Sequence, residues 1–578
     1  MTNVSRWLSS CLLSAAMVLS PWGNANETAI FSSKATAQPQ WAEQGMVSSQ
    51  EALASQVGVD ILRQGGNAVD AAVAVGFSLA VTLPRAGNLG GGGFMLVHLA
   101  EQDKTIAIDY REMAPSKAHK DIFIGEDGKV DSKLSLQHGL AVGVPGTVMG
   151  MELALKKYGT MTLSEVIQPA IKLARNGIRV TSDLANSLSH DYIRARMLDV
   201  PASKAIFYKQ DGSNYQPNEV LVQTDLADSL QRIAKRGSAG FYQGETAEKI
   251  VAAVQAAGGI MSLEDLKNYR ALERQPVTGQ YRGYEVVSMP PPSSGGVHII
   301  EMLNMLEQYP IKKLGHNSAA TIHLMAEVMR RAYADRSKYL GDPDFYDVPV
   351  AELIDKRYAK KRSSDINPDT ATPSSAISPG TLLPYESNQT THYSVVDKWG
   401  NAVSNTYTLN FSYGSGIVAA GTGILLNNEM DDFSAKPGVP NGFGLIGGEA
   451  NAVAANKRPL SSMTPTIVMK DGKPFLVTGS PGGSRIITTT LQIIMNVIDH
   501  GLNIAEATVA PRIHHQWLPD EIRIERSLNV DTRRLLEAKG HNLSEKNAMG
   551  STQSIMLTDK GIFGASDPRR ADSAALGY

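Results

Sequence analysis

The pattern of apolar and polar positions predicts two consecutive helices near the start of the globular chain. Apolar residues recur at helical spacing in the run that ends at Arg63, and the preceding Ser48-Ser49-Gln50-Glu51 resembles a capping box. Gly65-Gly66 ends this first helix, and Asn67 is a suitable N-cap for the next. Residues 69–81 are apolar on nearly every face, so we expect the second helix to be buried.

Further along, long helical patterns alternate with pairs of strand-like runs. Helical spacing dominates from about 145 to 270, from 296 to 340 and from about 486 to 500. Strand patterns cover residues 94–99 and 104–111, then 391–410 and 464–479. Strand pairs flanked by long helices predict a layered α/β fold.

A segment rich in Ser, Thr and Pro, at about 366 to 385, stops abruptly at a threonine that opens a strand. That arrangement suits a chain that is cut between Gln389 and Thr390. The cut would leave Thr390 with both a hydroxyl and a free α-amine, which together supply a nucleophile and its general base. We therefore expect a precursor whose first reaction is on itself.

Two predicted hairpins bring hydroxyl and glycine groups toward this threonine. A turn near Lys398 or Trp399 places Thr390 opposite Tyr407 or Thr408, with Asn410 just beyond the strand end. Thr408 would then offer a hydroxyl to Thr390, although a strand also favours Thr for packing alone.

The second hairpin turns at Asp471-Gly472, and its register brings Ser461 and Ser462 opposite the Pro481-Gly482 pair. Residues 479–484 end a strand and open a helix. Glycines there let a ligand approach the backbone, and the free N–H groups of a helix start favour an anion, as in an oxyanion hole. A plain turn remains the alternative.

Charged residues complete the candidate site. Arg111, at a strand end beside Gly93, is placed to clamp a carboxylate, or else to pair with Glu112 or a surface acid. The acids of Glu429-Met430-Asp431-Asp432 follow an apolar run and either hold a cationic amine or cap a helix. Together these groups predict a ligand with an α-carboxylate and an α-ammonium, whose acyl group meets the threonine.

Composition narrows the classes of partner and the compartment. The 578 residues carry a formal net charge of −2, so no basic field favours nucleic acid or anionic lipid. Arg6, the apolar stretch 7–19 and Gly23-Asn24-Ala25 form a secretory signal pattern over residues 1–25, too short to favour a stable membrane span. The only cysteine, Cys11, lies inside it, so the mature chain is expected to lack disulfides and a cysteine nucleophile.

Neither a metal nor another cofactor is expected. His514-His515 lacks further ligands at metal-site spacing, which favours an ordinary buried or surface pair. The glycines of residues 90–93 are not followed by the Gly-Lys-Ser or Gly-Lys-Thr of a phosphate loop.

Five stretches closely resemble γ-glutamyltransferase (γ-glutamyl transpeptidase) of the bacterial exported type. They are Thr390-Thr391-His392-Tyr393-Ser394, residues 400–410, residues 427–434, Arg458-Pro459-Leu460-Ser461-Ser462-Met463 and residues 479–485. The resemblance covers essentially the whole mature chain and implies an N-terminal nucleophile hydrolase with a four-layer αββα sandwich. It also implies a large subunit, residues 26–389, and a small subunit, residues 390–578, that form one unit after cleavage. With the signal pattern it implies a periplasmic protein, secretion into the medium being the alternative.

The resemblance assigns roles to matching positions. It implies that Thr390 is the nucleophile in self-cleavage and in catalysis, and that Thr408 supports its hydroxyl. The other matches are Arg111, Ser461 and Ser462 for the α-carboxylate, Asn410, Glu429 and Asp432 around the α-amine, and Gly482 and Gly483 for the oxyanion hole. The implied reaction cleaves the γ-glutamyl amide bond of glutathione and related compounds through an ester on Thr390. Water, an amino acid or a dipeptide then takes the acyl group.

Two positions differ from the common pattern of the family. Glu429 stands where many bacterial relatives have Gln, which predicts a more acidic amine pocket. Residues 437–448 resemble a lid loop, and Phe443 occupies the position of its gating tyrosine. Because phenylalanine has no hydroxyl to bond Asn410, we expect a looser lid and easier entry of water.

Three other functions remain open. An acylase of the same fold would cleave glutaryl or cephalosporin side chains, but these lack the α-amine that Asn410, Glu429 and Asp432 would hold. A depolymerase or transferase of poly-γ-glutamate would need an open groove, which the lid segment argues against. An exported binding protein for amino acids or peptides would have no reason to cut itself before Thr390.

Overall fold

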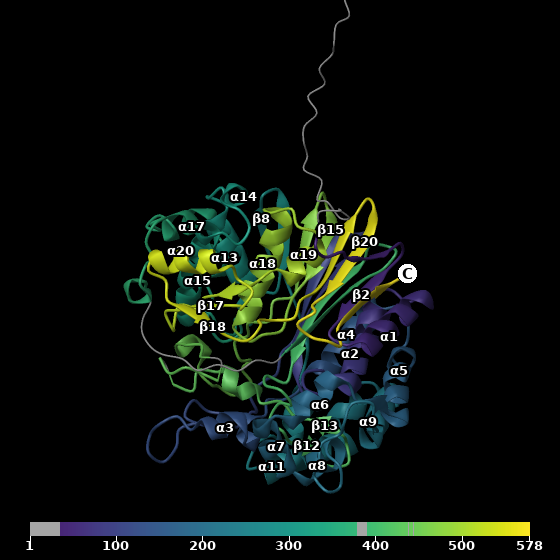
Figure 1. Ribbon diagram of the computed structural model, residues 1–578. Coiled ribbons are helices and arrows are strands. Elements are labelled where there is room, and N and C mark those ends of the chain that lie inside the picture. The colour runs from purple at the N-terminus through teal and green to yellow at the C-terminus, as the bar shows by residue number, and fades with distance from the viewer. Residues whose placement is uncertain (1–34, 379–389, 437, 443) are drawn as a thin grey trace, which may run out of the picture.

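Two seven-stranded antiparallel sheets form the centre of the computed structural model, which describes residues 35–378, 390–436, 438–442 and 444–578 (Figure 1). The first sheet has the order β21 (Ala574–Gly577), β2 (Met46–Ser49), β10 (Thr391–Val396), β11 (Ala402–Thr408), β3 (Gly92–Leu99), β4 (Lys104–Tyr110), β7 (Leu272–Arg274). The second has the order β1 (Gln40–Ala42), β20 (Gly561–Ser566), β19 (Gln553–Thr558), β15 (Lys473–Thr478), β14 (Thr466–Lys470), β9 (Tyr284–Ser288), β8 (Val277–Tyr281).

The two sheets pack face to face, and helices cover both outer faces. Apolar side chains such as Phe94 and Leu96 of the first sheet meet Ile467, Val477 and Ile555 of the second in one buried cluster. Figure 1 shows the strands running between two groups of helices. The molecule is therefore a four-layer αββα sandwich, which agrees with the layered α/β pattern of the sequence and with the architecture that the family resemblance implies.

The first sheet is covered by six long helices, which share one apolar core with it. They are α1 (Ala52–Arg63), α2 (Ala68–Thr82), α4 (Thr147–Tyr158), α5 (Leu163–Asn176), α9 (Thr224–Arg236) and α11 (Glu245–Ala256). Helices of the opposite layer form a second core against the other sheet. They are α13 (Gly295–Leu306), α15 (Ala319–Tyr339), α17 (Lys356–Arg362), α18 (Arg485–Ile498), α19 (Ile504–Val509) and α20 (Val530–Ala538).

Shorter elements connect these layers. The helices are α3 (Ser132–Leu136), α6 (Ser182–Ser189), α7 (Asp191–Leu198), α8 (Pro201–Phe207), α10 (Ala239–Tyr242), α12 (Leu263–Asn268), α14 (Ile311–Leu314) and α16 (Val350–Leu353). The strands are β5 (Ile178–Arg179), β6 (Val220–Leu221), β12 (Val418–Ala419), β13 (Ile424–Leu425), β16 (Ile513–His514), β17 (Ile522–Ile524) and β18 (Leu543–Glu545).

The start of α2 follows the sequence prediction, whereas the start of α1 corrects it. The Asn67 side chain accepts hydrogen bonds from the first turn of α2 and forms a capping box with Asp70. At α1 the N-cap is Glu51, whose carboxylate accepts from the backbone of Leu53 and Ala54. The predicted capping box at residues 48–51 is wrong because residues 48 and 49 continue strand β2, so the helix begins later.

The hairpin β10–β11 has the predicted register, and the hairpin β14–β15 does not. Thr391 pairs with Tyr407, so Thr390 lies opposite Thr408. In the second hairpin a bulge follows Val468, and Ile467 pairs with Val477 where an unbroken ladder would pair it with Leu476. Pro474 has no N–H for the ladder, and an irregular register beside a strand proline is a usual consequence.

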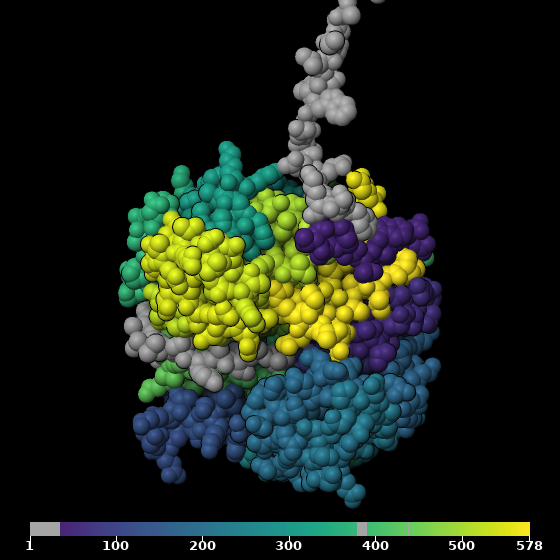
Figure 2. Space-filling view, viewed as in Figure 1, coloured from purple at the N-terminus to yellow at the C-terminus, as the bar shows by residue number. Residues whose placement is uncertain are grey.

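Each sheet combines strands that precede residue 390 in the sequence with strands that follow it. In the first sheet β10 and β11 lie between β2 and β3, and β21 pairs with the outer edge of β2. In the second sheet β1 pairs with β20, and β14 pairs with β9. Figure 2 shows this interleaving at the surface, where purple N-terminal and yellow C-terminal segments lie against each other. A cut at residue 389 would leave these ladders intact.

Candidate active site

Thr390 and Thr408 meet at one end of the hairpin β10–β11. Their Oγ1 atoms lie 3.4 Å apart, and both residues are buried. The Thr408 hydroxyl also accepts a hydrogen bond from the Asn410 backbone N–H at 2.8 Å. Asn410 has a φ of 75°, and its side-chain amide donates to the Asn428 carbonyl at 2.9 Å. A tight turn beyond β11 thus holds Asn410 beside the two hydroxyls.

Arg111 follows strand β4 directly and lines the same pocket as the two threonines. Its side chain is fully buried, with Nη1 donating to Glu429 and Nη2 to Asp432. Glu112 Oε2 lies 3.6 Å from Nη1. Burial acts to lower the pKa of Arg111, but the carboxylates of Glu429, Asp432 and Glu112 outweigh it and raise that pKa.

The acids come from a short 3₁₀ turn, residues Glu429–Asp432, that follows strand β13. Asp431 within this turn points elsewhere, because it accepts from the Ser135 hydroxyl at 2.7 Å and the Gly442 backbone at 2.8 Å. Glu429 and Asp432 instead share the guanidinium of Arg111. Burial raises the pKa of Glu429 well above its ordinary value, with Arg111 acting against that shift.

A glycine turn joins β15 to α18 and forms another part of the site. Gly482 has a φ of 137° and Gly483 a φ of 57°, both conformations that favour glycine. The carbonyls of these two residues accept the first backbone hydrogen bonds of α18, at 3.1 Å each. Gly483 lines the pocket, so the start of α18 lies beside it, and the oxyanion hole expected at this loop stays a prediction.

Ser461 and Ser462 reach the site on the segment that precedes β14. The Ser461 backbone donates to the Pro292 carbonyl at 2.8 Å, and its own carbonyl accepts from Ser294 Oγ at 2.7 Å. The Ser462 hydroxyl accepts from Arg336 Nη2 at 3.2 Å. Burial lowers the pKa of Arg336 to about 10, and no acid among the described residues forms an ion pair with it.

These groups line one pocket. Its walls combine nine predicted site residues with three apolar ones: Arg111, Thr390, Thr408, Asn410, Glu429, Asp432, Ser461, Ser462 and Gly483, with Leu445, Met463 and Ile486. Gly482 belongs to the same turn as Gly483 but is not part of the lining. Two further predicted positions, Gln389 and Phe443, lie outside the described residues.

Sequence reasoning missed the groups that support this pocket from behind. Glu112 appeared only as a competing partner for Arg111, yet it is fully buried beside the acids. Arg336 lies on α15, a helix with no local motif that points to the site. Charged residues are rarely fully buried, so a charge within an otherwise apolar helical face is the signal that could have found Arg336.

Histidines outside the pocket are hydrogen-bonded to neighbouring side chains. His514 bonds Thr488 and Gln516, and His515 bonds Asp520. His323, Glu327 and His541 place ligand atoms within 4.8 Å of one another. Glu327, however, already accepts from Arg330 and Arg331, so this cluster has the charge balance of an ion-pair network.

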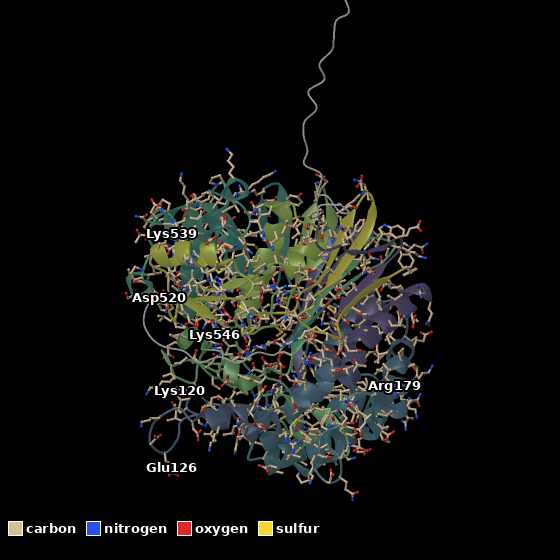
Figure 3. The ribbon with its side chains drawn as sticks, in the orientation of Figure 1. Lys120, Glu126, Arg179, Asp520, Lys539 and Lys546 are labelled. Carbon is tan, nitrogen blue, oxygen red and sulfur yellow. The ribbon has the colours of Figure 1, made fainter. Side chains whose placement is uncertain are left out.

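Charged side chains elsewhere are distributed over the surface. Lys120, Glu126, Arg179 and Lys546 are exposed, and Figure 3 shows Glu126 at the lower left edge of the molecule. In the part of the chain that the structure describes, no helix is both long and apolar enough to cross a membrane.

Comparison with known proteins gives consistent matches over most of the chain. A family model described as gamma-glutamyltranspeptidase matches residues 54–577. The chain is 60% identical over 541 residues to the glutathione hydrolase proenzyme of Escherichia coli strain K12, covering 93% of each. It is similar to the crystal structure of Helicobacter pylori gamma-glutamyltranspeptidase, with 52% identity, a TM-score of 0.55, and 57% of this chain and 93% of that chain covered. The cephalosporin acylase of Bacillus halodurans matches with 28% identity and a TM-score of 0.83, covering 95% and 98%.

Proposed function

The chain belongs to the gamma-glutamyltranspeptidase family, and we propose that it cleaves the γ-glutamyl amide bond of glutathione and related compounds through an ester on Thr390. One observation carries this proposal: the two threonine hydroxyls share a pocket with an arginine, two serines and two acids. Such a pocket offers partners for both charges of an α-amino acid and a nucleophile for its acyl group.

On binding, the γ-glutamyl group would replace the ion pairs between Arg111 and the two acids with ion pairs of its own. Its α-carboxylate would take the guanidinium of Arg111 and the hydroxyls of Ser461 and Ser462. Its α-ammonium would take Glu429 and Asp432, which contact Arg111 before a ligand binds, together with the Asn410 side chain. The side chain would then extend toward Thr390.

Activation would begin with Thr390 itself. Its hydroxyl adds to the Gln389 carbonyl, the Gln389–Thr390 amide bond breaks, and the resulting ester is opened by water. Residues 26–389 and 390–578 would then be separate chains that stay together as a heterodimer. The interleaved strands support that outcome, because β10 and β11 pair with β2 and β3 on either side.

In turnover the new α-amine of Thr390, with an ordinary pKa of about 7.7–8.0, would accept the hydroxyl proton. Thr390 Oγ1 would attack the γ-carbonyl, with Thr408 as a hydrogen-bond partner 3.4 Å away. The backbone N–H groups at Gly482 and Gly483 would stabilise the oxyanion, by about 3–4 kcal/mol each. The amine product leaves with the proton, and water, an amino acid or a dipeptide takes the γ-glutamyl group.

The signal pattern over residues 1–25 supports export, and we propose a periplasmic enzyme. Those residues lie outside the part of the chain that the structure describes.

A cephalosporin-type acylase is the second candidate, because one solved acylase shares the fold over 95% of this chain. Its glutaryl-type substrates would draw Arg111 to their carboxylate and bring no ammonium to replace it beside Glu429 and Asp432. Buried acids without such a partner are costly, so γ-glutamyl substrates are favoured.

Intact-mass measurement of the purified protein tests the proposal. We expect two fragments in the parent, the smaller one beginning at Thr390, and one uncut chain in Thr390→Ala. Thr391→Ala is the matched control, because the Thr391 hydroxyl is buried without a hydrogen-bond partner and should be dispensable. The proteins that are cleaved should hydrolyse a γ-glutamyl anilide, and the uncut Thr390→Ala variant should not. A folded parent that stays uncut and inactive would refute the proposal.

A further inference from the structure

Three carboxyl groups surround the buried guanidinium of Arg111. Glu429 contacts Nη1, Asp432 contacts Nη2, and Glu112 Oε2 lies 3.6 Å from Nη1. The side chains of Glu112 and Glu429 are 0% and 1% exposed. If all three acids were ionised, one guanidinium would face three negative charges in a site with little water. Buried like charges of this kind are strongly unfavourable.

Glu112 and Glu429 also lack the hydrogen bonds that buried carboxylates require. Both oxygens of Glu112 and Oε2 of Glu429 are buried and have no hydrogen-bond partner among the residues that the structure describes. An ionised carboxylate left in this state would be strongly unfavourable. A carboxyl that carries a proton can instead donate to its neighbour, which removes one charge and makes one bond.

Within the described part of the chain, no neighbouring hydroxyl supplies that bond to Glu112. Three tyrosines lie around it, and all three are committed to other acceptors. Tyr110 donates to the Asn405 side chain at 2.6 Å, Tyr242 to the Pro145 carbonyl at 2.9 Å and Tyr269 to the Arg111 carbonyl at 2.8 Å.

The backbone of Gly92 packs closely against the Glu112 carboxyl group. A Cβ atom at Gly92 would lie 2.7 Å from Glu112 Oε2, so only glycine fits there. The charged groups that act on Glu112 are then Arg111, Glu429 and Asp432. Burial raises the pKa of Glu112 to about 7, while Arg111 opposes the shift. Burial also raises the pKa of Glu429. When two such acids interact closely, the pair titrates as a unit, and the proton cannot be assigned to one of them.

We propose that Glu112 and Glu429 share one proton before a ligand binds, and that the α-ammonium group of a γ-glutamyl compound replaces it. The proton passes to solvent, so one cation is exchanged for another and the charge of the pocket is kept. Glu112 is thereby a positioning residue: it acts on the ligand through Glu429. This inference rests on the proposed function of the pocket and adds to it a proton linked to binding.

The sign of the pH dependence follows from the raised pKa. Below about pH 7 the pair holds its proton and binding must expel it, so the Kd for glutamate should fall about tenfold per pH unit as pH rises. Above that value the proton has already left, and the Kd should level off until the ligand amine deprotonates.

Calorimetric titration of the mature protein with glutamate, in two buffers of different ionisation enthalpy near pH 6, counts the protons released. We expect about one proton for the parent and close to none for Glu112→Gln, whose amide can donate to Glu429. Glu429→Gln is the second variant, because its amide can donate to Glu112. Glutarate, which lacks the α-amine, is the matched ligand and should release no proton from the parent.

The outcomes separate this inference from the proposed function. If glutamate does not bind the folded parent, the function assigned to the pocket is wrong. If it binds, but the parent and both variants release the same number of protons, the shared proton is wrong and the pocket assignment stands.

Discussion

Arg111 lies among the acids of the pocket, with Glu429 and Asp432 at its two terminal nitrogens. The sequence left two interpretations for this residue, a clamp for a ligand carboxylate or a partner for a neighbouring acid. The geometry unites them, because a zwitterion brings a carboxylate for the arginine and an ammonium for the acids. A γ-glutamyl ligand would therefore exchange existing charge pairs for new ones, with limited net cost in desolvation.

Thr408→Val tests the contact between the two hydroxyls at the residue scale. The substitution keeps the β-branched shape in strand β11 and removes the hydroxyl 3.4 Å from Thr390 Oγ1. We expect kcat for γ-glutamyl hydrolysis to fall about tenfold to a hundredfold, equivalent to about 1.4–2.7 kcal/mol. Thr408→Ser, which retains a hydroxyl, should recover most of the activity. Equal rates for Thr408→Val and the parent would show that the Thr408 hydroxyl has no part in the reaction.

The turn between β15 and α18 carries the backbone N–H groups that we propose bind the oxyanion. Its residues Gly482 and Gly483 have φ values of 137° and 57°, and the helix begins at Arg485. Residues with a Cβ rarely adopt the first of these conformations. The glycines are thus required by the path of the backbone, independently of any side chain.

Gly482→Ala tests this at the element scale. A Cβ at this position would meet no atom closer than 3.7 Å, so the cost lies in φ and not in packing. We expect a loss of about 1–3 kcal/mol of stability and a large drop in kcat, since the turn would relax away from the oxyanion position.

The matched control is Gly472→Ala, in the turn of the β14–β15 hairpin. Gly472 also has a positive φ, 75°, and a Cβ there would meet no atom within 4 Å, but this glycine lies away from the pocket. The variant should lose a comparable stability, about 1–2 kcal/mol, and keep its kcat. If both variants kept full activity, the glycine turn would have no role in catalysis.

At the scale of the whole molecule, the interior holds many histidines in uncharged form. Burial lowers the pKa of His392, His514 and His541 to about 3 in each case. In the unfolded chain the same groups return to an ordinary pKa of about 6.5. Below that pH the unfolded state binds protons that the folded state excludes, so acid favours unfolding.

We therefore expect these histidines to lower the free energy of unfolding as pH drops below about 6.5, against the opposite contribution of buried acids with a raised pKa, such as Glu112. Each such histidine contributes about 1.4 kcal/mol per pH unit below about pH 6.5. His392→Gln should show a shallower pH slope than the parent, by one proton, whatever its midpoint at neutral pH. Parallel slopes for the two proteins, measured by scanning calorimetry, would contradict a buried neutral His392.

The sequence by itself determined the local elements and the groups that depend on one hairpin. The Asn67 cap and the buried helix α2 follow from periodicity, and turn position limits the partner of Thr390 to Tyr407 or Thr408, of which the structure has Thr408. These features are predictable because each depends on residues close together in the chain. The glycine turn at residues 482–483 belongs to the same class.

Tertiary structure decided the rest. The bulge after Val468 shifted a register that turn position alone predicts, and strand β2 delayed the start of α1. Arg111 meets Glu429 across 318 residues of chain, and Arg336 meets Ser462 across 126. Such contacts depend on how two sheets and their helices pack, which no local period encodes. The contacts among the charged groups of the pocket could therefore not be predicted from the sequence, because they form only where distant acids and arginines are buried together.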